Sequence, residues 1–427
     1  MSNATLSDVY QLKCAVQNYD WGKLGEESKV AQFAAKTPDG FKIDKSKAYA
    51  ELWMGTHPNG PSLLVKDQTT SLKDVIAQNP YFYLSSKISQ QYDNDLPFLF
   101  KVLSVSKALS IQAHPDKKLG RELFEKFPKI YKDPNHKPEM AVAITTFEAL
   151  CGFRSLNEIA NYLDVYPEFR EIVSNEIANR YIETVSQLPE DIERNKAALK
   201  ELFAFLMTQD ANTIANQVKR LATRLTEENE PSKLESGSVS ELVVRLNQQF
   251  PGDVGIFCVF LLNYVRLEPG QAIFLGANEP HAYLSGDCVE CMAASDNVVR
   301  AGLTPKFKDV DVLVKMLTYR YGSAKSQILQ PESYQPSISK HSLLYDPPID
   351  EFSVILTQLP AGDNEERFAP INGPSIIIVT EGSGIMIVAK GPEKIIEMGN
   401  VYFIAAASKE VVLRSNEGLV CYRAFCS

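Results

Sequence analysis

The chain has 427 residues, more than one hydrophobic core of ordinary size contains, so two or three structural units are expected. Its formal net charge of -9 argues against a general nucleic-acid-binding protein, which would normally be basic, but leaves room for a small basic pocket that binds an anionic substrate. The sequence contains neither a run of about 18 apolar residues, as a membrane span requires, nor the basic and apolar parts of a signal peptide. We therefore expect a soluble cytoplasmic protein that binds neither nucleic acid nor membrane.

The seven cysteines do not have the spacing of a disulfide framework. Cys288 and Cys291 form a single C-x-x-C pair, which would suit a redox pair or half of a zinc site. No second pair stands at zinc-ribbon spacing, and the surrounding segment has the pattern of a strand. We interpret both residues as ordinary buried thiols.

Up to about residue 152 the chain consists of short apolar runs broken by Gly, Pro, Asn and Asp, which predicts strands joined by turns. The predicted strands lie within the segments 79–84, 96–105, 108–115 and 139–153.

Between about residues 153 and 262 the pattern changes to helical spacing. Ser155 and Glu158 fit a capping box at a helix start. Apolar residues then recur every three or four positions, which predicts amphipathic helices. They include Leu199, Leu202, Phe203 and Leu206, and then Ile214, Val218, Leu221 and Leu225. This part is predicted to be a helical insertion.

From about residue 263 to the end the strand pattern returns, and two stretches resemble each other. Segment 270–275 aligns with segment 399–404, each following a turn. His281 lies eleven residues past the first glycine, and Glu410 occupies that offset in the second copy. The similarity suggests two related β-barrels or jelly rolls, the second without its metal ligand.

The strand around residues 109–114 places Ser110, Gln112 and His114 on one face, because alternate side chains of a strand point to opposite faces. Lys137 and Glu139 share a face of the next strand. These faces would form either an enclosed polar site or an ordinary solvent-facing surface, and the spacing alone does not separate the two.

Two of the five histidines, His114 and His281, fall in such polar segments. Together with a carboxylate and an amide they form a plausible nitrogen and oxygen ligand set for a divalent metal. Four protein ligands normally close a structural site, so catalysis would need a fifth position for water or substrate.

A loop rich in Gly and Pro follows, and it concentrates the charges of Glu290, Asp296, Arg300 and Lys306. A solvated loop is one reading, and a phosphate-binding loop is the other, since Arg grips phosphate with two hydrogen bonds and Lys adds a point charge. No nucleotide-binding glycine motif is present.

Taken together, these segments resemble the type I phosphomannose isomerases, zinc enzymes of the cupin class. The resemblance runs nearly end to end, and the loop 295–302 is its most specific part. The motifs that carry it are Gln17–Gly22, Ala50–Pro58, Phe98–Leu103, Gln112 with His114, His136–Glu139, Asn278–Tyr283 and Ser295–Gly302.

The resemblance implies a mainly β fold of cupin-type jelly-roll barrels with a helical insertion. The implied units are a catalytic jelly roll (1–152 with 263–325), the insertion (153–262) and a C-terminal jelly roll (326–427). It implies one Zn²⁺ per chain with Gln112, His114, Glu139 and His281 as ligands, and Arg300 as a catalytic residue. Glu290 and Lys137, which lie in the same motifs, are the candidate catalytic groups for proton transfer. The implied substrate-binding residues are Ser110, Lys101, Lys306, Asp296, Trp21, Glu51 and His57.

The implied activity is the interconversion of mannose 6-phosphate and fructose 6-phosphate, by a monomer that supplies GDP-mannose synthesis and glycosylation. A proton route through an enediol is favoured over a hydride route directed by the metal, because Glu290 and Lys137 are candidate bases. Two alternatives stay open: another metal-dependent cupin enzyme, such as an iron-dependent oxygenase, and a non-catalytic sugar-binding cupin. An oxygenase would favour two histidines and one carboxylate, so Gln112 as a fourth ligand counts against it.

Overall fold

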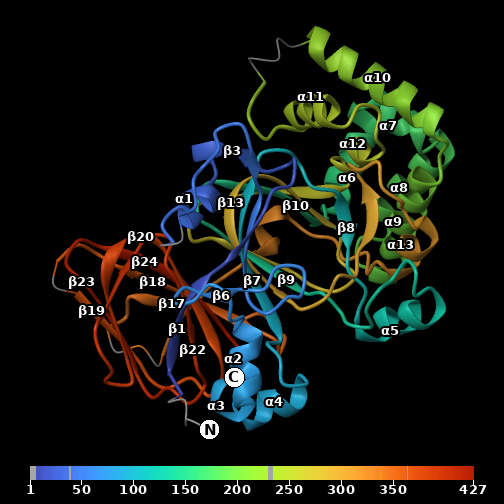
Figure 1. The fold of residues 1–427 in the computed structure, drawn as a ribbon. Coiled ribbons are helices and arrows are strands. Elements are labelled where there is room, and N and C mark those ends of the chain that lie inside the picture. The colour runs from blue at the N-terminus through green and yellow to red at the C-terminus, as the bar shows by residue number, and fades with distance from the viewer. Residues whose placement is uncertain (1–5, 38–39, 229–233, 336, 338, 363) are drawn as a thin grey trace.

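The computed structural model describes residues 6–37, 40–228, 234–335, 337, 339–362 and 364–427. Two sheet-rich bodies lie side by side, and a group of helices covers the far end of the first (Figure 1). Over the described residues, each body is built on one sheet of eleven strands.

The first sheet has the strand order β15-β12-β9-β13-β7-β5-β2, with β8, β10, β11 and β14 attached through β13. Its strands are β2 (Ala15–Gln17), β5 (Glu51–Met54), β7 (Phe98–Val105), β8 (Ile111–Ala113), β9 (Glu139–Ala143), β10 (Phe147–Phe153), β11 (Leu262–Leu267), β12 (Ala272–Leu275), β13 (His281–Ala293), β14 (Val299–Gly302) and β15 (Ile328–Leu329).

The second sheet has the order β16-β17-β18-β24-β20-β22-β1-β6, with β19, β21 and β23 attached beside it. Its strands are β1 (Val9–Lys13), β6 (Leu63–Leu64), β16 (Glu332–Ser333), β17 (Ser342–Tyr345), β18 (Ser353–Leu359), β19 (Asn364–Phe368), β20 (Ser375–Val388), β21 (Lys394–Glu397), β22 (Val401–Ile404), β23 (Val411–Ser415) and β24 (Leu419–Phe425). A small separate ribbon pairs β3 (Lys23–Leu24) with β4 (Ala48–Tyr49).

The helices fall into an insertion group and a scattered group. The insertion contains α6 (Leu156–Val165), α7 (Pro167–Ile172), α8 (Asn175–Gln187), α9 (Ile192–Met207), α10 (Ala211–Glu228), α11 (Val239–Gln249) and α12 (Gly255–Cys258). The others are α1 (Lys29–Ala34), α2 (Leu72–Gln78), α3 (Pro80–Leu84), α4 (Ser86–Gln91), α5 (Lys117–Lys126) and α13 (Val310–Met316).

The long strand β13 joins the two halves of the first sheet. Its residues from Gly286 onward pair with β7 and β9, whereas its first residues pair with β10 and, at His281, with β8. One strand therefore carries side chains into the interior from both halves, as in a jelly roll.

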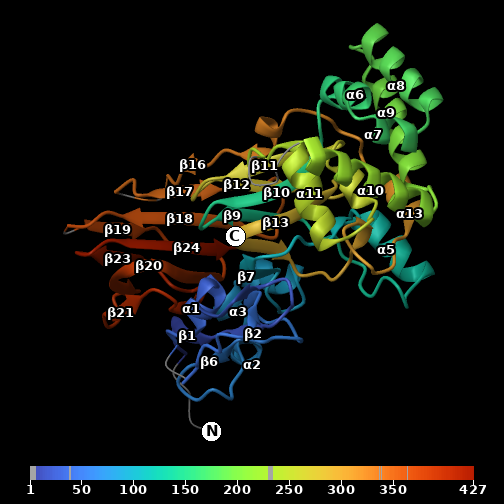
Figure 2. The same cartoon turned by 90° about the horizontal axis from the view of Figure 1, so that it is seen from above.

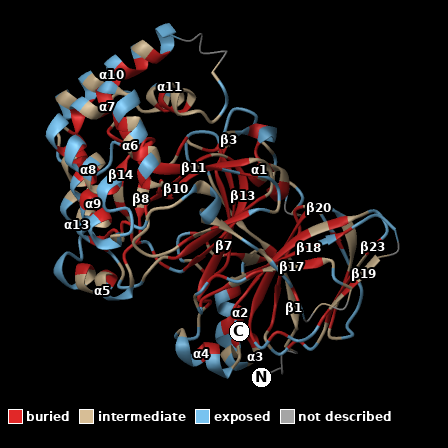
Figure 3. Cartoon of the chain, turned by 180° about the vertical axis from the view of Figure 1, so that it is seen from behind, coloured by how far each residue is buried: buried red, intermediate tan, exposed pale blue. Residues whose placement is uncertain are grey.

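Both outer faces of the first sheet are covered. On one half, Phe100, Val102 and Val289 share a buried core with Ile378 and Tyr422 of the second sheet. On the other half, the outward residues of β8, β13 and β14 lie in the core of the helical insertion; they are Ile111, Ala113, Ala282, Leu284, Val299 and Ala301. Seen from above, the second sheet and the insertion lie at opposite ends of the molecule (Figure 2), and buried residues fill the strands between them (Figure 3).

The predicted mainly β class with a helical insertion agrees with this architecture. The predicted boundaries of the three units stay predictions, and residues 229–233 of the insertion lie outside the described part. Strands β1 and β6, although they belong to the segment predicted as catalytic, pair within the second sheet: Val9 lies opposite Ile404.

Three local predictions were wrong. Glu290 and Arg300 were predicted to lie in a loop, but Glu290 lies in β13 and Arg300 in β14. Segment 79–84 was predicted as a strand but contains helix α3, because Asn79 caps its first turn by accepting a hydrogen bond from Phe82 N, and Pro80 favours the first helical position. Helix α6 begins after Ser155 as predicted, but the reciprocal capping bonds are not formed. The Ser155 hydroxyl instead donates to the Glu158 carboxylate at 2.5 Å.

The sequence similarity between the two sheets has a structural counterpart. Gly270 and Gly399 both have a positive φ, at +83° and +89°, and each precedes a four-residue strand that begins two positions later. Glu410, at the offset of His281, lies 3.5 Å from Arg367 in the second sheet.

Cys288 and Cys291 are buried, as predicted, on opposite faces of β13. Cys288 lies in the interior cluster of the first sheet, and Cys291 lies in the core shared with the second sheet. Burial raises the pKa of both thiols well above the ordinary value, which keeps them protonated and unreactive.

A buried carboxylate links the two bodies, and its removal should weaken the fold in a pH-dependent way. Glu351 Oε1 lies 2.7 Å from His136 Nε2 and 2.9 Å from Lys117 Nζ. Burial alone would raise the pKa of Glu351, but these two partners outweigh it and lower the pKa to about 2. Because the folded pKa is below the ordinary value, the stabilisation is present above about pH 4.5 and is lost as pH falls toward 2.

Glu351→Gln should therefore lower the free energy of unfolding at pH 7 by about 1–3 kcal/mol, measured by urea denaturation. The difference from wild type should shrink as pH falls below about 4.5. Glu393→Gln, in an exposed ion pair with Arg414, is the control and should change stability by less than about 0.5 kcal/mol. An equal loss for both variants would contradict this assignment.

Candidate metal centre and active site

Three strands bring His114, Glu139 and His281 together. His114 follows β8, Glu139 begins β9 and His281 begins β13. Because Ile111 and Ala113 point into the helical core, the alternate side chains of this segment point into the sheet interior. The predicted polar face is therefore enclosed rather than solvent-facing.

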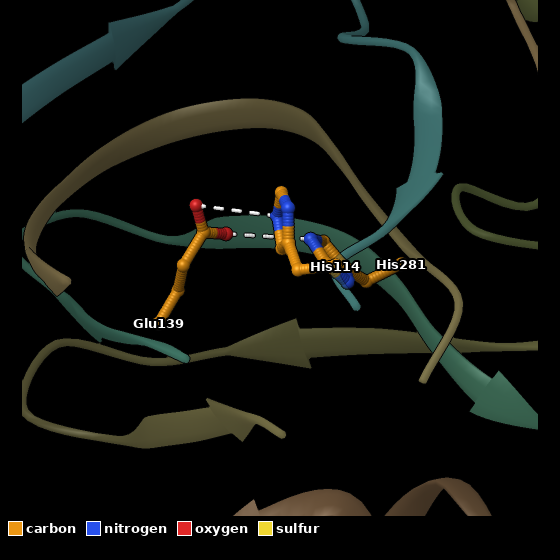
Figure 4. Close-up of side chains that lie close together, drawn as sticks. All are labelled: His114, Glu139 and His281. Carbon is orange, nitrogen blue, oxygen red and sulfur yellow. Dashed lines mark ion pairs between the residues drawn. The ribbon is translucent and has the colours of Figure 1, made fainter. Parts of the chain in front are cut away.

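The three side chains converge on one point (Figure 4). Their ligand atoms lie within 4.8 Å of one another, and all three residues are buried. His114 Nε2 lies 3.4 Å from Glu139 Oε1, and His281 Nε2 lies 3.3 Å from Glu139 Oε2. Ligand atoms at two corners of a tetrahedron around a metal about 2.1 Å away are about 3.4 Å apart, so the spacing fits a metal-binding cage.

The other ring nitrogens set the tautomer of both histidines. His114 Nδ1 lies 2.6 Å from the Asn297 carbonyl oxygen, and His281 Nδ1 lies 3.0 Å from the Glu279 carbonyl oxygen. Each Nδ1–H therefore donates to the backbone and leaves the Nε2 lone pair free for a metal. Both Nε2 atoms are buried without a hydrogen-bond partner among the described residues. Burial lowers the pKa of His114 to about 4, which favours the neutral, ligating form.

Gln112 lies beside this cage. Its Cα is paired with those of His281 on β13 and Arg300 on β14, and Ser110 Oγ lies 3.5 Å from its side-chain oxygen. The amide is thus close to the histidine of one neighbouring strand and the guanidinium-bearing residue of the other. Its role as a metal ligand stays a prediction.

A row of charged side chains continues from the cage across the interior of the sheet. Lys101 Nζ lies 3.1 Å from Glu290 Oε2 and 3.4 Å from Glu51 Oε2, and all three residues are buried. Glu290 is opposite Ala141 on β9, two residues from Glu139, so the two carboxylates are diagonal neighbours on one face.

The charges in this row shift one another's pKa. Burial raises the pKa of Glu290, although Lys101 opposes the rise. Burial alone would lower the pKa of Lys101, but Glu51 and Glu290 outweigh it, so the ammonium form is favoured. Lys137 Nζ lies 3.0 Å from Glu139 Oε1; despite burial, Lys137 and His114 hold the pKa of Glu139 well below its ordinary value.

A cavity of about 300 Å³ gathers four of the predicted site residues, which line it together with Lys107 and the loop 303–306. The four are Trp21, Ser110, Arg300 and Lys306. Neither Arg300 nor Lys306 forms an ion pair with any residue that the structure describes. Burial lowers the pKa of Arg300, but a guanidinium stays charged in proteins. The lining holds three cations, Arg300, Lys306 and Lys107, against the single carboxylate of Asp20, so the cavity suits an anionic ligand.

His57 and Asp296 form a separate pair, 3.7 Å apart between Nε2 and Oδ1. The His57 and Trp53 rings meet edge to face, with centroids 4.8 Å apart. The nearby imidazole of His57 lowers the pKa of Asp296. The Asp296 side chain is 60% exposed, so this pair lies toward solvent.

Three further residues belong to the site but were not predicted. Trp53 donates a hydrogen bond to Glu51 and lies below Lys101, whose Nζ is 5.4 Å from the ring centroid. Tyr283 is buried in the interior two residues after His281, and Lys107 lines the cavity. The two-residue period of a strand could have predicted Trp53 and Tyr283, because Trp53 shares a strand face with Glu51 and Tyr283 shares one with His281.

Comparisons with known proteins support one family. Models of type I phosphomannose isomerase match residues 9–156 (catalytic domain), 172–262 (helical insertion domain) and 342–390 (C-terminal). A mannose-6-phosphate isomerase of Candida glabrata is 46% identical over 99% of both chains, and one of Saccharomyces cerevisiae is 47% identical over 98% of both. The chain belongs to the type I phosphomannose isomerases. This family membership counts against the iron-dependent oxygenase.

Solved structures agree with this assignment and confirm the predicted fold class. A mutant of phosphomannose isomerase from Salmonella typhimurium has 31% identity and a TM-score of 0.81, with 98% of this chain and 99% of that chain covered. A zinc-bound mannose 6-phosphate isomerase has 30% identity and a TM-score of 0.81, with 99% and 100% covered.

Removing one cage residue should remove the metal without unfolding the protein. His281→Ala should lower the metal content from about one equivalent per chain to less than about a tenth, because a buried cage with one ligand missing binds weakly. Mass spectrometry of the bound metal measures this, with circular dichroism as the check on folding. Glu410→Gln, at the corresponding offset of the second sheet, is the matched control and should keep its metal. Full metal content in His281→Ala would exclude the cage as the binding site.

Proposed function

We propose that this chain is a zinc-dependent isomerase that interconverts mannose 6-phosphate and fructose 6-phosphate. The observation that carries the proposal is the enclosed cage of His114, Glu139 and His281 beside a cavity with two unpaired cations. The first provides nitrogen and oxygen ligands for zinc, and the second provides charge for a phosphate. The names of the relatives support mannose 6-phosphate as one of the two sugars.

In this proposal Gln112 completes the ligand set, with one Zn²⁺ per chain. Bound zinc would act as a Lewis acid toward a substrate oxygen. Arg300 and Lys306 bind the phosphate with help from the Ser110 hydroxyl, and Trp21 forms the wall beside them. Lys101, Glu51, His57 and Asp296 bind sugar hydroxyls through charge-assisted hydrogen bonds.

We propose that the hydrogen moves between C1 and C2 as a proton, through an enediol. Glu290 accepts the proton from one carbon and returns it to the other, and its raised pKa makes it a better base near neutral pH. Lys101 holds the Glu290 carboxylate in place. Lys137 exchanges protons with the sugar oxygens at C1 and C2.

The wider role is also a proposal. A monomer in the cytoplasm would supply mannose 6-phosphate for GDP-mannose synthesis and glycosylation, as the family resemblance implies. No helix in the described part of the chain is long and apolar enough to span a membrane. Depletion of the protein in its host, followed by measurement of the GDP-mannose pool, tests this role.

Glu290→Gln should lower kcat by about 10²–10⁴ with the metal still bound, because it removes a general base and keeps the shape of the side chain. The assay couples fructose 6-phosphate to a dehydrogenase readout. Glu51→Gln is the matched comparison: it also removes one carboxylate partner of Lys101, and it should change kcat far less. Similar kcat values for Glu290→Gln and wild type would mean that another group moves the proton.

Unphosphorylated mannose should be a very poor substrate. Each charge-assisted hydrogen bond to phosphate contributes about 1.5–3 kcal/mol, so two or three together are equivalent to several powers of ten in kcat/KM. Steady-state kinetics with mannose and mannose 6-phosphate measure the ratio. No turnover of mannose 6-phosphate by the zinc-loaded protein would refute the proposed function, and equal turnover of both sugars would refute the phosphate site.

A further inference from the structure

Lys306 belongs to the loop 303–309, and no ion pair to the described residues holds its side chain in place. The residue is exposed. Its position in the cavity beside Arg300 must therefore be set by the backbone of the loop. A flexible lysine on a loose loop would lose conformational entropy on binding a phosphate, whereas a held loop avoids part of that loss.

One carboxylate from the helical insertion holds the start of this loop. Asp253 lies in the turn between α11 and α12. Its Oδ1 accepts hydrogen bonds from Gly255 N at 2.7 Å and Leu303 N at 2.6 Å, and its Oδ2 lies 3.3 Å from Thr304 N. A single side chain thus binds the backbone of the insertion and that of the loop at once.

The backbones at Gly302 and Gly255 are so close that neither position has room for a side chain. A Cβ added to Gly302 would lie 2.6 Å from Gly255 Cα, so the two backbones touch directly. Leu303 then has a φ of +53°, which a leucine rarely adopts and which costs about 1–3 kcal/mol unless its surroundings hold it. Its side chain is buried in the core of the insertion, and its N–H is bound by Asp253.

The restraint extends to Lys306 through one further residue. Thr304 Oγ1 accepts a hydrogen bond from Lys306 N at 3.1 Å, so Asp253, Thr304 and Lys306 form a short chain of hydrogen bonds. The far end of the loop is held as well, because Tyr131 donates to the Asp309 carboxylate at 3.0 Å.

We propose that Asp253 is a positioning residue through which the helical insertion holds the loop that binds the substrate's phosphate. The inference rests on the proposed function, since it takes Lys306 as a phosphate contact. It assigns the insertion a task in substrate binding that is separate from covering the outer face of the sheet. Asp253 does not touch the substrate and acts only through the loop.

The test compares Asp253→Ala and Asp253→Asn with wild type in the zinc-loaded protein. The control is Asp191→Ala, which removes a comparable backbone hydrogen bond, Arg194 N to Asp191 Oδ1 at 3.1 Å, from the same insertion but far along the chain from the loop. The readouts are KM and kcat for mannose 6-phosphate, inhibition by inorganic phosphate, melting temperature and metal content.

Asp253→Ala should raise KM and the inhibition constant of inorganic phosphate together, by about tenfold, with kcat within about threefold and the metal retained. Asp253→Asn keeps the Oδ1 acceptor and should lie between Asp253→Ala and wild type. Asp191→Ala should lower the melting temperature without changing phosphate inhibition.

Unchanged phosphate inhibition in both Asp253 variants would overturn the inference. It would also be overturned if kcat, metal content and phosphate affinity all fell in proportion to the loss in melting temperature, because that pattern indicates a general loss of stability. If wild type does not isomerise mannose 6-phosphate, the proposed function fails. In that case the affinity for inorganic phosphate, measured by calorimetry on the same variants, still decides whether Asp253 positions an anion-binding loop.

Discussion

The structure depends on a sheet whose two halves are covered on their outer faces, while their inner faces carry the charged side chains of the site beside an apolar cluster. Along β7, β9 and β13 the outward residues pack against the second sheet, and along β8 and β14 they pack against the helical insertion. Because side chains alternate along a strand, every second residue is directed inward at a defined spacing. A slip of one residue would place charged side chains in an apolar core, so the same packing that stabilises the fold also sets the register of the site.

Burying so many charges is possible only because they compensate one another. The interior holds three carboxylates, Glu51, Glu139 and Glu290, against the ammonium groups of Lys101 and Lys137. One negative charge remains, and a divalent ion in the cage would reverse its sign. The cavity lined by Arg300 and Lys306 then adjoins a positively charged interior, which attracts an anionic substrate even though the whole chain carries a charge of -9.

The sequence was sufficient for features that depend on local periodicity. The inward placement of Gln112, His114 and Glu139 follows from a period of two, and the buried stripe of α10 from a period of 3.6. The sequence pattern was insufficient where a few hydrogen bonds decide the local structure, as at the helix starts at Asn79 and Ser155. It was also insufficient where distant segments meet: no local pattern shows that Asp253 binds the backbone of Leu303, fifty positions later, or that the first strand belongs to the last sheet. Contacts between distant segments depend on how all the elements pack together, so no single stretch of sequence predicts them.

The pairing of β1 with β22 has a consequence for synthesis of the chain. Val9 lies beside Ile404 in the finished sheet, so an edge formed by the first residues cannot be covered until almost the whole polypeptide has been made. At roughly 5–20 residues per second the interval is about 20–80 s. During that time only the edge of β1 that faces β6 can be paired, and the edge that faces β22 stays open. The helical insertion, whose contacts are local, can already fold as it emerges from the ribosome.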